Sequence, residues 1–245
     1  MFTNLKFPKA LEERKKNKIL LVDTDVLSDI SKNGPSKQIE VELLQRGVIL
    51  LYSLTSIMEL GFGPTDLTTQ EEERFYKSLY LRKNAINKDI FVTQFSVKYK
   101  LKELESLRGK WVAVSPDSHN WYAAKQTLVA YMNDKRDAPQ KALKLQVDAL
   151  LSCAAWNAGA FLWTNNIKDH LLATYYTMHS LCTRNRDKQS EESLKCIASS
   201  MVPIFDTELL IRVIAGESFN IFYEMKKKTK DHQIIQVLEI AENLL

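Results

Sequence analysis

Short apolar runs, separated by longer amphipathic stretches, set the pattern of this chain. The runs predict strands at 19–22, 48–52, 111–114, 160–163 and 201–205. The first run, Ile-Leu-Leu-Val, is apolar at every position, which is typical of a parallel strand covered on both faces. Pro203 lies inside the last run, and because proline cannot donate a ladder hydrogen bond, we expect that strand at a sheet edge. Strands that alternate with helical stretches predict an α/β fold.

Helical periodicity occupies most of the sequence between these runs. A helix is expected from Ser36, as N-cap, to Gly47, and another from Ser56. Further helices are expected from Asp117, over 139–159, and from about Asp169 past Ser180. We therefore predict one domain over residues 1–245, with a helical insertion at about 64–110 and extra helical segments at about 171–200 and 206–245, the last containing two or three short helices.

Composition adds only mild constraints. A hydrophobic content of 45% over 245 residues is enough for a substantial core. The 34 Lys and Arg residues against 30 Asp and Glu give a net charge of +4, which permits a nucleic-acid partner without requiring one. Residues 1–18 lack the apolar core of a signal peptide, and no apolar run approaches the ~18 residues that span a bilayer. We therefore expect a soluble protein with no membrane partner.

Three cysteines, Cys153, Cys182 and Cys196, show no zinc-site spacing. Two of them lie in helical patterns beside alanine and leucine, so we interpret all three as buried free thiols. Free thiols persist in reducing compartments, which leads us to expect a cytoplasmic protein.

Carboxylates recur where the predicted strands end. Asp23 follows the run at 19–22, Glu59 follows the run at 48–52, and Asp169 follows the run at 160–163. Asp148 lies on the helical pattern that leads into that last strand. The carboxyl ends of parallel strands share one edge, where ligands bind, so these side chains are expected to converge. Like charges gather at low cost only around a cation, and carboxylate oxygens suit Mg²⁺ or Mn²⁺. The pattern predicts a divalent-metal site.

Each of the four carboxylates also has a purely structural explanation. Asp23 can simply end a strand, and Glu59 can be the capping partner of Ser56. Asp148 can lie on a solvated helix face, and Asp169 can complement the helix dipole. The set of four is stronger evidence than any single member.

Four segments, at 19–25, 55–63, 147–155 and 162–170, resemble in order the four acidic motifs of PIN-domain ribonucleases. They read Ile-Leu-Leu-Val-Asp-Thr-Asp, Thr-Ser-Ile-Met-Glu-Leu-Gly-Phe-Gly, Val-Asp-Ala-Leu-Leu-Ser-Cys-Ala-Ala and Leu-Trp-Thr-Asn-Asn-Ile-Lys-Asp-His. The bacterial VapC-type toxins are the members most similar to this chain. Asp25 stands where the family usually has Asn, and His170 where it usually has Phe. The chain is also longer than typical toxin members.

The resemblance implies a PIN-like three-layer fold, with a central parallel sheet of about five strands in the order 3-2-1-4-5 flanked by helices. It also implies Mg²⁺- or Mn²⁺-dependent hydrolysis of RNA that leaves a 5′-phosphate and a 3′-hydroxyl. Asp23, Asp148 and Asp169 are the expected direct ligands, and Glu59 binds directly or through water. Thr24, Thr164 and Asn166 are expected to orient these ligands or the attacking water. Asp25 either adds charge to the site or caps the next turn.

RNA would be held through its phosphate charges, and an antitoxin protein and a homodimer are the partners that the toxin resemblance implies. The candidate RNA contacts are Lys168, Arg184, Arg186, Lys188 and Lys226–Lys228, although a single basic residue of this kind is more often a solvated surface residue. We expect His170 to be a packed or exposed histidine rather than a phosphate contact.

Two other functions are compatible with these residues. Asp23-Thr24-Asp25 is also similar to the opening motif of haloacid dehalogenase-type phosphatases, in which Asp23 would be the nucleophile and Asp25 the general acid. The late acidic motif of that family is missing here, where Thr164-Asn165-Asn166 stands instead. A PIN fold can also serve as a non-catalytic RNA-binding subunit, although the intact acidic set argues against this.

Overall fold

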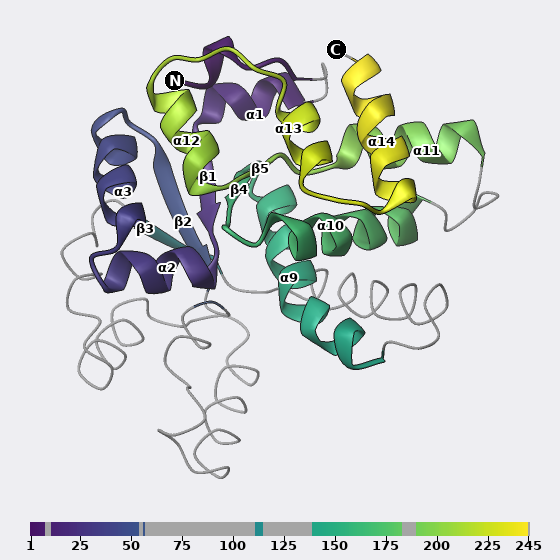
Figure 1. The fold of residues 1–245 in the computed structure, drawn as a ribbon, viewed down its shortest axis with the longest axis horizontal. Helices are drawn as coiled ribbons and strands as arrows, with labels where there is room; N and C mark the ends of the chain where they lie inside the picture. The colour runs from purple at the N-terminus through teal and green to yellow at the C-terminus, as the bar shows by residue number, and fades with distance from the viewer. Residues whose placement is uncertain (8–10, 54–55, 57–110, 115–138, 183–189, 245) are drawn as a thin grey trace, which may run out of the picture.

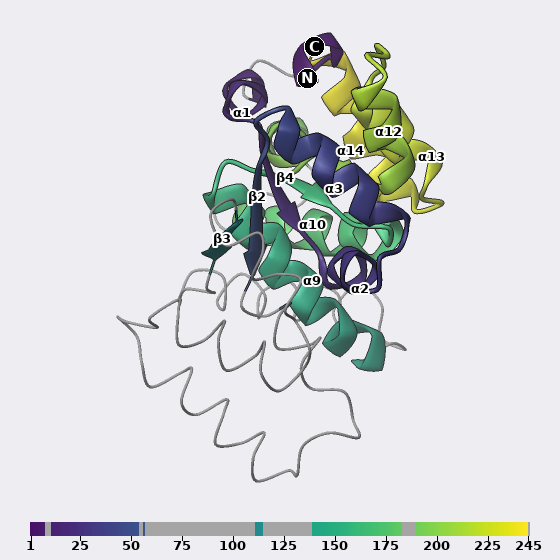
Figure 2. The ribbon, with the colours of Figure 1, turned by 90° about the vertical axis from the view of Figure 1, so that its left-hand side faces the viewer.

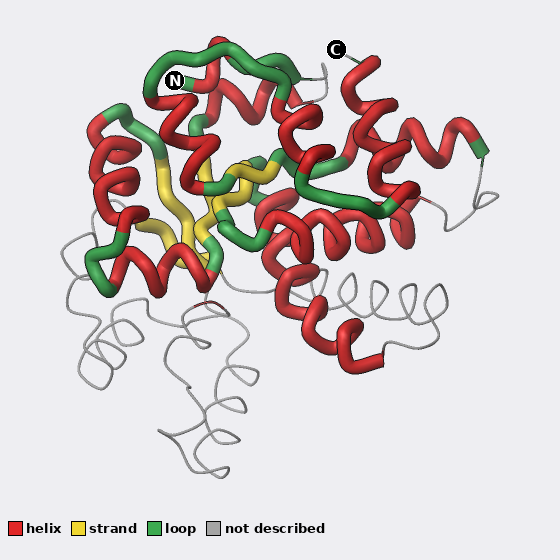
Figure 3. The backbone as a smooth tube through the Cα atoms, in the orientation of Figure 1, coloured by secondary structure: helices red, strands yellow, loops and turns green. Residues whose placement is uncertain are grey.

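The chain forms an α/β fold in which helices flank a parallel sheet, as the sequence predicts (Figures 1 and 3). The structure is a computed structural model that describes residues 1–7, 11–53, 56, 111–114, 139–182 and 190–244. The predicted insertion at 64–110 and the helices expected beyond Ser56 and from Asp117 lie outside the described residues.

All strand pairs in the sheet are parallel. The strands are β1 (Ile19–Val22), β2 (Ile49–Ser53), β3 (Trp111–Val114), β4 (Phe161–Trp163) and β5 (Ile204–Phe205). They lie in the order β3-β2-β1-β4-β5, with β1 at the centre (Figure 1). Because every strand runs in the same direction, the carboxyl ends of all five face one edge of the sheet.

The central strand is buried on both faces. Leu20, Leu21 and Val22 have no exposed surface, and successive strand residues point to opposite faces. Both faces of β1 are therefore covered, as its unbroken apolar sequence predicts. At the end of the sheet formed by β5, the Pro203 carbonyl accepts a hydrogen bond from the Leu162 amide at 3.0 Å. The proline thus joins the ladder as an acceptor only.

Helices pack around the sheet in several groups. The described helices are η1 (Phe2–Asn4), α1 (Glu12–Asn17), α2 (Thr24–Ser31), α3 (Pro35–Gln45), α9 (Pro139–Asn157), α10 (Ile167–Cys182), α11 (Glu191–Ser200), α12 (Thr207–Ile214), α13 (Ile221–Lys227) and α14 (His232–Asn243). Helix α9 packs against β1, β4 and α10, whereas α3 packs against α2 and α12. Helix α14 packs against α11 and α13.

The first helices of the chain differ from the sequence prediction. Helices α1 and α2 were not expected, and α2 begins directly after β1 with Asp23 as its N-cap. Helix α3 begins at Pro35, with Gly34 as N-cap, and not after Ser36. Proline favours the first helical position because it has no amide hydrogen to leave unpaired. The Ser36 amide instead donates to the Asp29 carboxylate at 2.7 Å, which ties α3 to α2.

The polar N-terminal segment is anchored in the core. The ring of Phe7 stacks on that of Phe161 at 5.0 Å, and Phe2 meets Phe161 edge to face at 5.2 Å. The buried guanidinium of Arg14 donates to the carbonyls of Trp156 at 2.9 Å and Ala160 at 3.2 Å. It also lies over the Trp156 ring, and burial lowers the pKa of Arg14 to about 10. Arg14 therefore caps the carboxyl end of α9.

The prediction of three free cysteines is wrong. Cys182, at the end of α10, forms a disulfide with Cys196 in α11, while Cys153 is buried and is not part of a disulfide. The error arose because apolar surroundings report burial and carry no information about which thiol lies opposite. Because two of the three cysteines form a disulfide, free thiols no longer support a cytoplasmic location.

Within the described ranges, no helix combines the length and the hydropathy that crossing a bilayer requires.

Candidate functional site

Asp23 lies at the carboxyl end of the central strand. Its amide donates to the Trp163 carbonyl at 2.9 Å, so the pairing of β1 with β4 continues to this residue. One carboxylate oxygen, Oδ1, accepts a hydrogen bond from the Thr24 amide at 2.6 Å and caps α2. The residue is only 6% exposed. The strand thus places a buried carboxylate at the edge of the sheet where the sequence predicts it.

Two further groups hold the other oxygen of Asp23. The hydroxyl of Thr164, a fully buried residue just after β4, donates to Oδ2 at 2.8 Å. Nε2 of His170, also fully buried, lies 2.8 Å from the same oxygen. Burial alone would raise the pKa of Asp23. The nearby His170 and the hydrogen bonds from His170, Thr164 and Thr24 outweigh burial, so this pKa lies below its usual value.

Asp148 reaches the same place from helix α9. Its Oδ1 lies 3.4 Å from His170 Nε2, so one imidazole nitrogen contacts carboxylates from two elements. Burial raises the pKa of Asp148 to about 6, with further increases from the charges of Asp23 and Asp169, while His170 opposes the rise. At neutral pH this carboxyl group is charged in the folded state, and because its pKa is raised, keeping it charged lowers the free energy of unfolding.

His170 has the opposite shift. Burial lowers the pKa of an imidazole, but Asp23, Asp148 and Asp25 favour the protonated ring and raise the pKa to about 9. Nδ1 of His170 has no hydrogen-bond partner among the described residues. The ring is therefore oriented by its contacts at Nε2.

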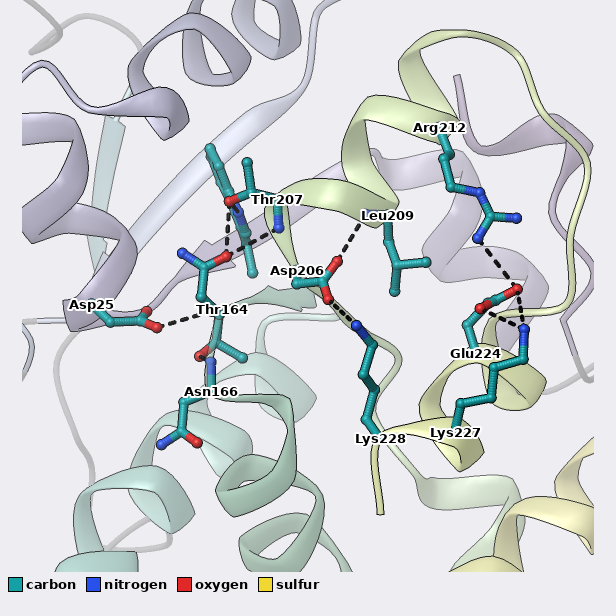
Figure 4. Close-up of polar contacts among 12 residues, drawn as sticks. Asp25, Thr164, Asn166, Asp206, Thr207, Leu209, Arg212, Glu224, Lys227 and Lys228 are labelled. Carbon is teal, nitrogen blue, oxygen red and sulfur yellow. Dashed lines mark hydrogen bonds and ion pairs between the residues drawn. The ribbon is translucent and has the colours of Figure 1, made fainter.

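Asp25 lies in the first turn of α2 and faces the loop that follows β4. Its Oδ1 accepts from the Val26 amide at 2.6 Å, and its Oδ2 accepts from the Asn165 amide at 2.9 Å (Figure 4). Burial, followed by the charge of Asp23, raises the pKa of Asp25 to about 6, although both amide donors lower it. Of the two roles predicted for Asp25, the structure is compatible with both: it adds charge near Asp23, and it accepts from an amide of its own turn.

The loop between β4 and α10 positions Asp169. The Asn166 amide donates to the Thr164 hydroxyl at 3.0 Å, and the Asn166 side chain donates to Asp169 Oδ2 at 3.1 Å. Asp169 lies in the first turn of α10, close enough to Asp148 to raise the pKa of Asp148. Thr164 and Asn166 are thus hydrogen-bonded to the carboxylates of Asp23 and Asp169.

Asn165 links this loop to the neighbouring strand end. Its side-chain oxygen accepts from the hydroxyl of Thr207 at 2.9 Å and from the Thr207 amide at 3.2 Å (Figure 4). The Thr207 hydroxyl also accepts from Trp163 Nε1 at 3.3 Å. Asn165 therefore connects Asp25, β4 and the start of α12.

The structure brings Asp23, Asp25 and Asp148 together around His170, with Asp169 near Asp148. Glu59, the fourth predicted ligand, lies outside the described residues. Within the described part of the chain, no group of three or more His, Cys, Asp or Glu side chains has an arrangement ready to hold a metal ion. At Asp23, one carboxylate oxygen already accepts bonds from Thr164 and His170.

His170 was expected to be a packed or exposed histidine, and it is packed, but its contacts with Asp23 and Asp148 were not anticipated. Asn165 was not singled out at all. The signal available for His170 was its position directly after Asp169, which puts it in the first turn of the same helix.

The candidate RNA-binding residues have different surroundings. Lys168 is exposed in the first turn of α10, beside Asp169. Arg184, Arg186 and Lys188 lie outside the described residues.

The lysines of α13 and its C-cap are in ion pairs. Lys226 pairs with Glu242 at 2.7 Å, and Lys227 pairs with Glu224 at 3.1 Å. Lys228 pairs with the N-cap of α12, Asp206, at 2.9 Å (Figure 4). These ion pairs account for the basic run Lys226–Lys228 as part of the folded C-terminal helices, so Lys168 is the stronger RNA candidate among the described residues.

Comparison with known proteins identifies no relative. No family model, curated protein or solved structure matches this chain. The function must therefore be argued from the site itself.

Proposed function

We propose that the carboxyl edge of the sheet binds a divalent metal ion and that the protein hydrolyses RNA phosphodiester bonds there. The observation that carries the proposal is the convergence of Asp23 and Asp148, from a strand and a distant helix, on the single atom His170 Nε2. Asp169 lies near enough to raise the pKa of Asp148. A carboxylate whose pKa is raised by burial and by neighbouring carboxylates, as that of Asp148 is, would be stabilised in its charged form by a cation.

The donor set suits a hard divalent ion. Carboxylate oxygens are the ligands that Mg²⁺ and Mn²⁺ prefer in proteins. Asp148 and Asp169 would hold the ion together with Asp23, and Glu59 remains the predicted fourth ligand. Such an ion supplies positive charge against the negative charge that develops on a phosphate during hydrolysis.

The chain's own residues have distinct roles in this proposal. Thr164 fixes the carboxylate of Asp23, and Asn166 fixes that of Asp169, through the hydrogen bonds described above. Fixed ligands need little rearrangement when substrate arrives. The exposed ammonium of Lys168 can attract the RNA backbone beside the site.

A cleavage assay tests the proposal. A short end-labelled RNA is incubated with Mn²⁺ and wild-type protein, Asp23→Asn or Asp148→Asn, and the product ends are analysed. We expect wild type to leave a 5′-phosphate and a 3′-hydroxyl, and both variants to lose cleavage. Asp231→Asn is the matched control, because Asp231 caps the remote helix α14 and Asn caps as well as Asp. Equal cleavage by wild type and Asp148→Asn would point to a contaminating nuclease.

A phosphatase is the second candidate, and one observation favours it. The pKa of Asp25, raised to about 6 by burial and then by Asp23, suits a general acid. Both oxygens of Asp25 are, however, held by amides, which favours a structural role. Hydrolysis of p-nitrophenyl phosphate in preference to RNA, lost in Asp25→Asn, would select the phosphatase. RNA binding without cleavage in Mn²⁺ would select the non-catalytic RNA-binding protein.

The partners are proposed from the resemblance to VapC-type toxins alone. They are an antitoxin encoded beside this chain and a second copy of it. Co-purification with the product of the neighbouring reading frame tests the first, and light scattering of the purified protein tests the second. Sequencing of RNA ends after induced expression would identify the RNA target.

A further inference from the structure

His170 occupies an unusual position for a histidine. It is fully buried in the first turn of α10, directly after a predicted metal ligand. Its Nε2 lies 2.8 Å from Asp23 Oδ2 and 3.4 Å from Asp148 Oδ1. A single nitrogen therefore stands between two of the carboxylates that the proposed metal ion would use.

The hydrogen bonds of Asp23 show what this contact excludes. A carboxylate offers about four acceptor positions, two on each oxygen. Oδ1 accepts from the Thr24 amide, and Oδ2 accepts from both the Thr164 hydroxyl and His170 Nε2. Both positions on Oδ2 are therefore filled. A cation can bind Oδ2 only after one of these donors leaves.

We propose that His170 is a positioning residue that clamps Asp23 to Asp148 while no metal ion is bound, and that it releases Asp23 Oδ2 when a divalent ion takes its place. This inference rests on the proposed function in one respect, namely that the acidic edge binds such an ion. It goes further by stating that the ion competes with a side chain of the protein itself.

The clamp requires only a hydrogen on Nε2. Both the imidazolium and one neutral tautomer carry that hydrogen, so the geometry holds in either protonation state. Since Nδ1 has no hydrogen-bond partner among the described residues, the contacts at Nε2 are the polar interactions that fix the ring there. Thr164 keeps its own bond to Asp23 when His170 leaves, so the carboxylate stays at the edge of the sheet.

Two substitutions separate the clamp from simple packing. His170→Phe fills the space without a donor, whereas His170→Gln keeps an N–H group that can reach Asp23. His179→Phe is the matched control, because it makes the same change in the last turn of the same helix. Thermal unfolding in EDTA measures the clamp, and the electron paramagnetic resonance signal of free Mn²⁺ measures metal affinity.

We expect His170→Phe to unfold at a lower temperature than wild type in EDTA, because the clamp is missing. We also expect it to bind Mn²⁺ about tenfold more tightly than wild type, because the ion no longer displaces a hydrogen bond to a charged group. His170→Gln should stay close to wild type in both measurements, and His179→Phe should leave Mn²⁺ affinity unchanged. Equal or weaker Mn²⁺ binding by His170→Phe would overturn the inference. Absence of Mn²⁺ binding in wild type and in every variant would instead overturn the proposed function.

A measurement on the wild-type protein covers the case in which His170→Phe does not fold. The chain has four histidines, so their ring N–H resonances can be resolved after ¹⁵N-histidine labelling, and the spectrum of His170→Gln assigns that of His170. Saturating Mg²⁺ should remove the downfield, hydrogen-bonded position of the His170 Nε2–H resonance. A resonance that stays in place while Mg²⁺ binds would show that the ion does not compete with His170.

Discussion

Replacing Asp148 with Asn should stabilise the metal-free protein. The side chain of Asp148 is 19% exposed, and its pKa is raised to about 6, chiefly by burial and then by Asp23 and Asp169 against the opposing effect of His170. A carboxyl group with a raised pKa binds more protons in the folded state than in the unfolded state. Stability is therefore lost as the pH rises from about 4 to about 6, and the full cost is present above that range.

The magnitude follows from the size of the shift. Between the reference pKa of 3.8 and about 6 the cost reaches about 3 kcal/mol at pH 7, at roughly 1.4 kcal/mol for each pK unit. The amide introduced by Asp148→Asn resembles the protonated carboxyl group and avoids that cost, while its oxygen can still accept from His170. For a protein of this size, about 3 kcal/mol corresponds to a rise of roughly 6–12 °C in Tm.

Calorimetry in EDTA at pH 7 and pH 5 measures this effect. We expect the gain from Asp148→Asn to be about half as large at pH 5, because part of the wild-type carboxyl group is already protonated there. A variant that is no more stable than wild type at pH 7 would refute the reasoning, since the carboxylate would then not be held at a cost.

Four further outcomes are expected. Mn²⁺ at about 100 times its Kd should raise the free energy of unfolding of wild type by about 2.7 kcal/mol and its Tm with it. In Asp23→Asn most of this rise in Tm should be lost. Thr164→Val should lower the free energy of unfolding in urea by about 1–3 kcal/mol, because a buried carboxylate loses its hydroxyl donor, whereas Thr164→Ser should not. Arg14→Ala should cost roughly 2 kcal/mol, since the buried Ala160 carbonyl loses its donor and the Trp156 carbonyl keeps only its bond from the Gly159 amide. Arg14→Lys should recover only part of this, because one ammonium replaces a forked donor. Replacing Cys182 and Cys196 together by Ser should lower the free energy of unfolding by about 3 kcal/mol, and a reductant should have the same effect on wild type. A Tm that changes with neither the substitutions nor the reductant would show that the disulfide does not constrain the unfolded chain.

The hydrophobic pattern was sufficient for the α/β class and for most of the strand limits. Strand β1 occupies 19–22 and β3 occupies 111–114, both as predicted. For β1 the unbroken apolar run corresponds to burial on both faces. Strand β5 is shorter than the predicted 201–205: its register with β4 covers Ile204 and Phe205, and the Pro203 carbonyl accepts one hydrogen bond before the strand begins.

The candidate site was only partly predictable. Asp23 could be located because it follows a strand, and its edge of the sheet follows from the parallel arrangement. The contact between Asp23 and His170 joins residues 147 positions apart, and a periodic pattern carries no information about such partners. The disulfide was missed for the same reason, since the pattern around Cys182 and Cys196 shows apolar neighbours and not the sulfur that each one meets.

The start of the chain also lies against a segment near its end. The Asn4 side chain donates to the Gly216 carbonyl at 3.0 Å, the Ser218 hydroxyl donates to the Asn4 carbonyl at 2.8 Å, and Lys6 forms a parallel bridge with Asn220. Both termini lie on one side of the molecule, away from the end of β1 that carries Asp23 (Figures 1 and 2). An affinity tag, fluorophore or fused polypeptide attached at either terminus would therefore emerge opposite the acidic edge, so the protein can be tethered to a surface from either end with that edge turned toward the solution.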